Sequence, residues 1–156
     1  MPRTDSASRV IAAPAEEAYA ALVDPAALEA WLPPTGMTAR VDELDLRPGG
    51  AYRMVLTYDD PAGAHGKSTA DADVVDARFV EIVPGARVAY AVRFVSDDPA
   101  YAGVMTMTWH VAEVGGGTRV DVVAVDVPEG ISPEDHATGM ASSLDHLAAY
   151  LENRRR

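Results

Sequence analysis

The segment Leu46-Arg47-Pro48-Gly49-Gly50-Ala51-Tyr52-Arg53-Met54-Val55-Leu56 joins a Pro-Gly-Gly turn to a run in which large apolar residues alternate with others. Arg53 and Thr57 stand on the opposite face of this run. Strict alternation predicts a half-buried antiparallel strand. Its apolar face consists of Tyr52, Met54, Leu56 and Tyr58, and side chains of this bulk can line a cavity or fill a core.

The length and composition indicate one soluble domain, which we place at residues 1–156 with an ordered core of about 6–152. A chain of 156 residues buries roughly 70% of the surface that its unfolded form exposes. The chain has no cysteine, which excludes disulfides, thiolate metal sites and a cysteine nucleophile and is typical of a reducing compartment. We see no signal peptide or membrane span, and we expect a cytoplasmic protein.

The charge of the chain argues against one class of partner. The formal net charge is -11 at pH 7, so the summed field of the protein repels phosphate backbones and anionic lipid surfaces. We therefore expect no nucleic-acid partner, and solubility is the ordinary reason for such acidity.

Helix signals stand at both ends of the chain. A short strand is expected at 8–12, and Pro14 followed by Glu16 and Glu17 predicts a helix start. Asp24 then caps a second short helix that ends near Trp31. Between 38 and 127 the chain reads as about six strands in a meander, broken by turn residues at 47–50, 59–63, 84–85, 97–99 and 115–117.

The last helix sets the architecture. Ser132 as the N-cap and Pro133 in the first turn predict its start, and it should run to about Arg154. Its apolar stripe has helical spacing and must lie against the apolar face of the sheet, which gives an α+β domain. The stripe consists of Met140, Ala141, Leu144, Leu147, Ala148 and Leu151.

This order of elements resembles the helix-grip fold, a curved antiparallel sheet of about six or seven strands around a long C-terminal helix. Successive segments are similar to signatures of the START-like (SRPBCC) superfamily, in the branch related to the activator of Hsp90 ATPase. They are residues 13–19, 24–31, 47–53, 80–84, 117–120 and 139–147. Two positions depart from the pattern, because Leu32 and Met140 stand where relatives often carry an aromatic ring.

The resemblance implies a cavity between the long helix and the sheet that holds a hydrophobic or amphipathic small molecule. Methionines on the inward-facing positions agree with this, because methionine adapts to irregular gaps. The alternative is that these side chains simply fill the core. The expected ligand-binding residues are Trp31, Tyr52, Met54, Tyr90, Phe94, Met105, Met107, Trp109, Met140 and Leu144.

The sequence assigns no catalytic residue, no metal site and no cofactor. The segment His65-Gly66-Lys67-Ser68 lacks the first glycine of a phosphate-binding loop, since Pro61 stands in its place. The four histidines, His65, His110, His136 and His146, never fall four apart on one helix. General acid or base chemistry would have to use a polar group of the pocket, for which the candidates are Tyr52, Tyr58, Tyr90 and Arg53.

Three functions therefore stay open. The first is a binding module for a hydrophobic small molecule. The second is a co-chaperone that stimulates an Hsp90-type ATPase through its surface, and the third is a cyclase or hydrolase, on fold-level analogy alone. The protein is expected to be a monomer or a homodimer, with an edge strand near Val41 as one surface that could pair.

Overall fold

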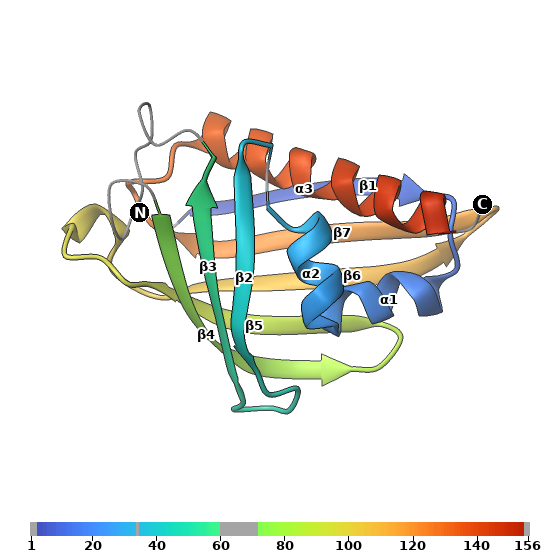
Figure 1. The fold of residues 1–156 in the computed structure, drawn as a ribbon, viewed down its shortest axis with the longest axis horizontal. Helices are drawn as coiled ribbons and strands as arrows, with labels where there is room; N and C mark the ends of the chain where they lie inside the picture. Colours follow the sequence, from blue (N-terminus) through green and yellow to red (C-terminus); the bar gives the residue numbers. More distant parts are fainter. Residues whose placement is uncertain (1–2, 34, 60–71, 155–156) are drawn as a thin grey trace.

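A single antiparallel sheet curves around a long helix in the computed structural model, which describes residues 3–33, 35–59 and 72–154 (Figure 1). The sheet has seven strands in the order β1-β7-β6-β5-β4-β3-β2. Strands β2 to β7 follow one another as a meander, and β1 pairs with β7. The strands are β1 (Arg3–Ile11), β2 (Met37–Leu44), β3 (Ala51–Tyr58), β4 (Ala72–Val83), β5 (Arg87–Phe94), β6 (Met105–Val114) and β7 (Gly117–Val127).

Three α-helices and a 3-10 turn complete the described part of the chain. Helices α1 (Ala15–Val23) and α2 (Pro25–Trp31) follow β1, the 3-10 turn η2 (Pro99–Tyr101) joins β5 to β6, and α3 (Pro133–Arg154) ends the chain. The Asp24 carboxylate caps α2 by accepting from the backbone N–H of Ala26 at 3.2 Å. The Ser132 hydroxyl likewise caps α3, since it accepts from the backbone N–H of Asp135 at 3.0 Å. Both predicted caps are confirmed.

The Pro-Gly-Gly turn fixes where β3 begins. Gly49 adopts a φ of 82°, a left-handed conformation that favours glycine. A Cβ at Gly50 would lie 2.0 Å from the Asp45 carbonyl oxygen, so no other residue fits there without a shift. Around this turn the backbone N–H of Gly49 donates to the Phe79 carbonyl and that of Phe79 donates to the Gly50 carbonyl. The turn is thus tied to β4, which sets the register that points Tyr52 inward.

Helix α3 lies along β1 and over the concave face of the sheet (Figure 1). Arg9 of β1 forms an ion pair with Asp145, and Glu152 accepts from the backbone N–H of Ala12. The C-terminal half of the helix is packed tightly, and its buried residues are Leu144, Leu147, Ala148 and Leu151. This half of α3 therefore belongs to the core.

The α+β helix-grip architecture expected from the sequence is confirmed. The first strand is longer than the predicted 8–12, because polar residues from Arg3 onward also pair with β7 up to Val127. Their low apolar content gives no strand signal in the sequence. The segment His65-Gly66-Lys67-Ser68 lies outside the described residues. No helix in the described ranges has both the length and the apolar character needed to cross a membrane.

A candidate ligand cavity between the helix and the sheet

A cavity of about 640 Å³ lies between the N-terminal half of α3 and the inner face of strands β3 to β6. Most of its lining is apolar and comes from every second residue of four neighbouring strands. Helix α3 adds Met140 and a glycine, Gly139, which contributes no side chain to fill the space. Strand β2 adds Met37, and the lining residues of β3 to β6 are Tyr52, Met54, Leu56, Tyr58, Asp73, Val75, Tyr90, Val92, Phe94, Met105, Met107 and Trp109.

An aromatic group lies on the sheet side of the cavity. Tyr52 stacks on Phe79 with ring centroids 5.4 Å apart, and the Tyr90 ring meets the Tyr52 ring edge-on at 5.1 Å. The hydroxyl of Tyr90 accepts a hydrogen bond from the indole N–H of Trp109 at 2.9 Å. Both tyrosines are buried, with exposed fractions of 4% for Tyr52 and 8% for Tyr90. The rings of Tyr52, Phe79 and Tyr90 thus pack against one another beside the cavity.

The hydroxyl of Tyr52 has no hydrogen-bond partner among the described residues. A buried hydroxyl without a partner costs about 1–3 kcal/mol. Burial raises the pKa of Tyr52 well above its ordinary value, and the neighbouring Tyr90 raises it further. Burial raises the pKa of Tyr90 to about 12, against a smaller lowering by the Trp109 hydrogen bond. Both phenols therefore stay protonated and neutral at physiological pH.

Polar residues lie where α3 begins. Asp135, His136 and Thr138 line the cavity there, and Asp73 lines it from β4. The Nδ1 atom of His136 lies 2.7 Å from the Asp5 carboxylate. The cavity lining therefore includes two acidic side chains and a histidine that is hydrogen-bonded to Asp5.

A network of charged groups fixes the start of α3 to β1. Arg3 donates to the Asp5 carboxylate at 2.9 Å and to the Ile131 carbonyl at 2.6 Å. The hydrogen bond from Arg3 lowers the pKa of Asp5, burial opposes this shift, and the hydrogen bond with His136 lowers the pKa further. Asp5 thus stays ionised beside His136 and anchors the end of the helix that borders the cavity.

Eight of the ten residues expected to bind ligand line the cavity, and two do not. Trp31 is fully buried, and its indole N–H donates to the Ala21 carbonyl at 2.9 Å. Leu144 is 2% exposed and is not among the residues that line the cavity. The structure therefore places Trp31 and Leu144 behind the cavity wall and not on it. The lining residues are Tyr52, Met54, Tyr90, Phe94, Met105, Met107, Trp109 and Met140.

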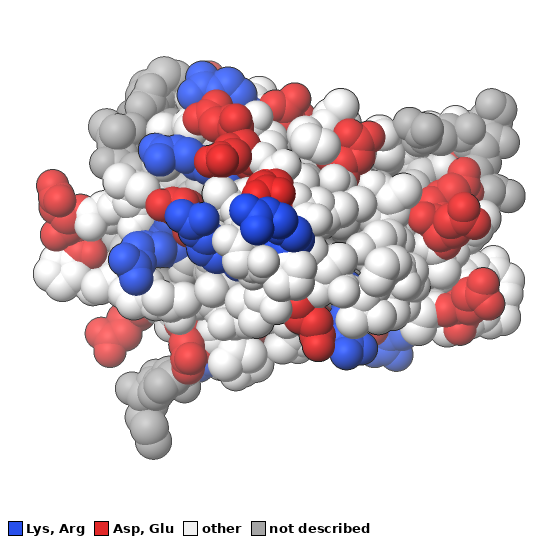
Figure 2. All heavy atoms as spheres, turned by 90° about the horizontal axis from the view of Figure 1, so that it is seen from below, with Lys and Arg blue, Asp and Glu red and all other residues white. Residues whose placement is uncertain are grey.

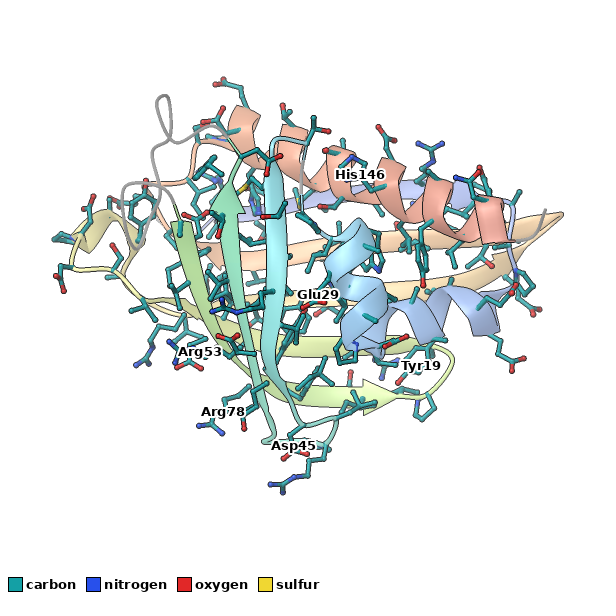
Figure 3. The ribbon with its side chains drawn as sticks, in the orientation of Figure 1. Tyr19, Glu29, Asp45, Arg53, Arg78 and His146 are labelled. Carbon is teal, nitrogen blue, oxygen red and sulfur yellow. The ribbon has the colours of Figure 1, made fainter. Side chains whose placement is uncertain are left out.

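Of the four polar residues considered for acid or base chemistry, three line the cavity and one does not. Tyr52, Tyr58 and Tyr90 line the cavity. Arg53 is exposed and points to the outer side of the sheet, where Figure 3 also places Arg78. On the face seen in Figure 2, basic and acidic side chains are interspersed. The alternation therefore predicted the outward position of Arg53 correctly.

The histidines do not gather at one place. His146 of α3 lies beside the α2–β2 connection, where Nδ1 is 2.9 Å from the Pro33 carbonyl and Nε2 is 3.2 Å from the Thr35 hydroxyl (Figure 3). His136 contacts Asp5, and His110 is half-buried on β6. The described residues contain no group of three or more histidines and acids placed to hold a metal ion.

Several lining residues were not foreseen. Asp73 and Val75 share the inward-facing positions of β4, so alternation could have found them. Others come from connections and helix ends, where the sequence carries no periodic signal. They are Leu32, Thr35, Tyr101, Gly130, Ile131 and Ser132.

Residues 12–152 match the family described as activator of Hsp90 ATPase homolog 1-like protein. The chain belongs to this family. Protein CV1439 from Chromobacterium violaceum is 36% identical to this family member, with a TM-score of 0.83 and 96% of each chain covered. The START-like resemblance drawn from the sequence is therefore confirmed.

More distant structures share the fold alone. A protein from Arthrobacter aurescens is 18% identical, with a TM-score of 0.80 over 96% of this chain and 86% of the other. DynU16, a protein of the dynemicin biosynthetic locus, is 18% identical, with a TM-score of 0.67 over 97% of this chain and 48% of its own. None of the curated proteins matches the sequence.

Proposed function

We propose that this family member binds a hydrophobic or amphipathic small molecule in the cavity between α3 and the sheet. The observation that carries the proposal is the cavity itself, with a volume of about 640 Å³ and a mostly apolar lining. Pockets for small molecules have volumes of about 300–1,000 Å³ and combine apolar walls with a few polar groups. The cavity is open to solvent on one side, so a small molecule can enter it and bury apolar surface against its walls.

A cavity-filling substitution tests the proposal. Met107 lines the cavity from β6, whereas its neighbour Thr108 lies on the opposite face of the same strand. We would titrate the wild type, Met107→Trp and the control Thr108→Trp with Nile red, an uncharged apolar dye whose fluorescence rises in an apolar site. The thermal midpoint of each variant would be measured in parallel.

The proposal predicts that the wild type and Thr108→Trp bind the dye and that Met107→Trp binds it at least tenfold more weakly. The melting temperature of Met107→Trp should stay level or rise, because the indole occupies empty space. Overpacking of a filled core costs about 1–3 kcal/mol. A strong loss of stability in Met107→Trp, or dye binding that the substitution leaves unchanged, would contradict the proposal.

A second function is favoured by the family match. The family is described by an activator of the Hsp90 ATPase, so a co-chaperone role through the protein surface is the alternative proposal. Its test is the ATPase rate of an Hsp90-type chaperone with an excess of this protein, at low and at high salt. Stimulation that falls with salt would support it, and an unchanged rate would remove it.

A further inference from the structure

The two tyrosines of the cavity indicate the chemistry of its occupant. Resting on the proposed function, we propose that the ligand is uncharged and places a hydrogen-bond-accepting oxygen, such as that of a ketone, quinone or ester, against the hydroxyls of Tyr52 and Tyr90.

The Tyr52 hydroxyl supplies the first argument. Tyr52 lines the cavity, its side chain is buried, and its hydroxyl has no partner among the described residues. A phenol hydroxyl has one proton to donate, and a buried polar group without a partner is costly. A ligand oxygen that accepts this proton would remove the cost.

The hydrogen bond between Tyr90 and Trp109 indicates that the ligand group is a hydrogen-bond acceptor and not a donor. An indole N–H can only donate, so the hydrogen bond from Trp109 takes up the acceptor side of the Tyr90 hydroxyl. The Tyr90 hydroxyl can then still donate its own proton, and within the described residues no acceptor takes that hydrogen bond. The two ring centroids are 5.1 Å apart, so both tyrosines belong to the same part of the cavity lining. A carbonyl oxygen has two lone pairs and can accept from two donors.

The other polar residues argue against an anionic ligand. Among the described residues that line the cavity there is no lysine or arginine, while Asp73 and Asp135 are present. His136 is already hydrogen-bonded to Asp5. A carboxylate buried without a cationic partner loses a large amount of hydration energy. The cavity therefore suits a neutral molecule better than a fatty-acid-like anion.

Three probes of nearly equal shape separate these possibilities. They are 2-acetylnaphthalene, which has a carbonyl oxygen, 2-ethylnaphthalene, which has none, and 2-naphthoate, which is an anion. Binding would be measured by calorimetry at neutral pH on the wild type, Tyr52→Phe and Tyr19→Phe. Tyr19 of α1 provides the matched control, because it undergoes the same chemical change outside the cavity lining (Figure 3).

We expect Tyr52→Phe to weaken the binding of 2-acetylnaphthalene about three- to tenfold, which corresponds to one net hydrogen bond. The same variant should bind 2-ethylnaphthalene as tightly as the wild type or more tightly. Tyr19→Phe should change neither, and 2-naphthoate should bind the wild type more weakly than the ketone. Comparing each probe between proteins cancels the differing water solubilities of the probes.

Two kinds of failure can be told apart. If neither Nile red nor any naphthalene binds, the proposed function fails. If the dye binds but Tyr52→Phe affects ketone and hydrocarbon alike, or the naphthoate binds more tightly than the ketone, the cavity stands as a binding site and the inference about its ligand is overturned.

Discussion

Removing the hydroxyl of Tyr52 should stabilise the ligand-free protein, although most substitutions of buried residues destabilise. In Tyr52→Phe the stacked ring on Phe79 is kept and a buried hydroxyl without a partner is lost. Such a group costs about 1–3 kcal/mol. We take the lower end, because the missing oxygen also leaves a small gap, and expect a gain of about 1 kcal/mol. For a chain of this length that gain raises the melting temperature by about 2–4 °C.

Tyr90→Phe is the matched comparison. The same hydroxyl oxygen is removed from a neighbouring ring, but we expect the free energy of unfolding to fall and not to rise. The Tyr90 hydroxyl accepts from the Trp109 indole at 2.9 Å, and Trp109 is 3% exposed. Without the hydroxyl, the indole N–H is left buried and unpaired, at a cost of about 1–3 kcal/mol.

Equilibrium urea unfolding followed by tryptophan fluorescence would measure both changes, on protein refolded from denaturant so that no ligand is retained. The midpoint should rise for Tyr52→Phe and fall for Tyr90→Phe, with the slope unchanged. If Tyr52→Phe lost 1 kcal/mol or more, the Tyr52 hydroxyl would have a partner in solution and the reasoning would be refuted.

Three further substitutions probe the core, the network at the start of α3 and the turn before β3. Leu144→Ala should lower the free energy of unfolding by about 2–5 kcal/mol, and Met107→Ala should lower it by less than half as much in the same urea assay. The reason is that Leu144 is buried in the core, whereas Met107 borders the cavity. Equal losses of stability in the two variants would show that no open cavity exists. The pKa of Asp5 is held below its ordinary 3.8, so its carboxylate stabilises the fold above that pH, and this contribution is lost as the pH falls through the lowered pKa. In Asp5→Asn the free energy of unfolding should therefore fall less steeply with decreasing pH in the acid range than in the wild type. The same acid dependence in both proteins would exclude a stabilising role for the Asp5 carboxylate. Gly50→Ala should destabilise by about 2 kcal/mol or more, because its Cβ would strike the Asp45 carbonyl, and a melting temperature equal to that of the wild type would contradict the geometry.

The fold was predictable because its signals are local. Alternation gave the inward face of β3, and the caps at Asp24 and Ser132 gave the starts of two helices. These signals depend on neighbouring residues in the chain. The first part of β1 was missed because its strand character comes from pairing with β7, which polar residues do not reveal.

The cavity was predictable only in part. Periodicity identifies the face on which a side chain lies but not its position along the space that the face encloses. Met140 and Leu144 are both buried on one face of α3, yet Met140 lines the cavity and Leu144 does not. Trp31 is removed from the wall by its hydrogen bond to Ala21. The unpaired Tyr52 hydroxyl is a property of three-dimensional packing that no sequence pattern carries.

Native mass spectrometry of the freshly purified protein tests the central claim most directly. The wild type and Met107→Trp would be purified side by side and compared with their denatured chain masses. The proposed function predicts a reproducible small-molecule adduct on the wild type that is absent from Met107→Trp and can be extracted for identification. The bare chain mass in both proteins, or the same adduct on both, would contradict the claim that the cavity holds a ligand.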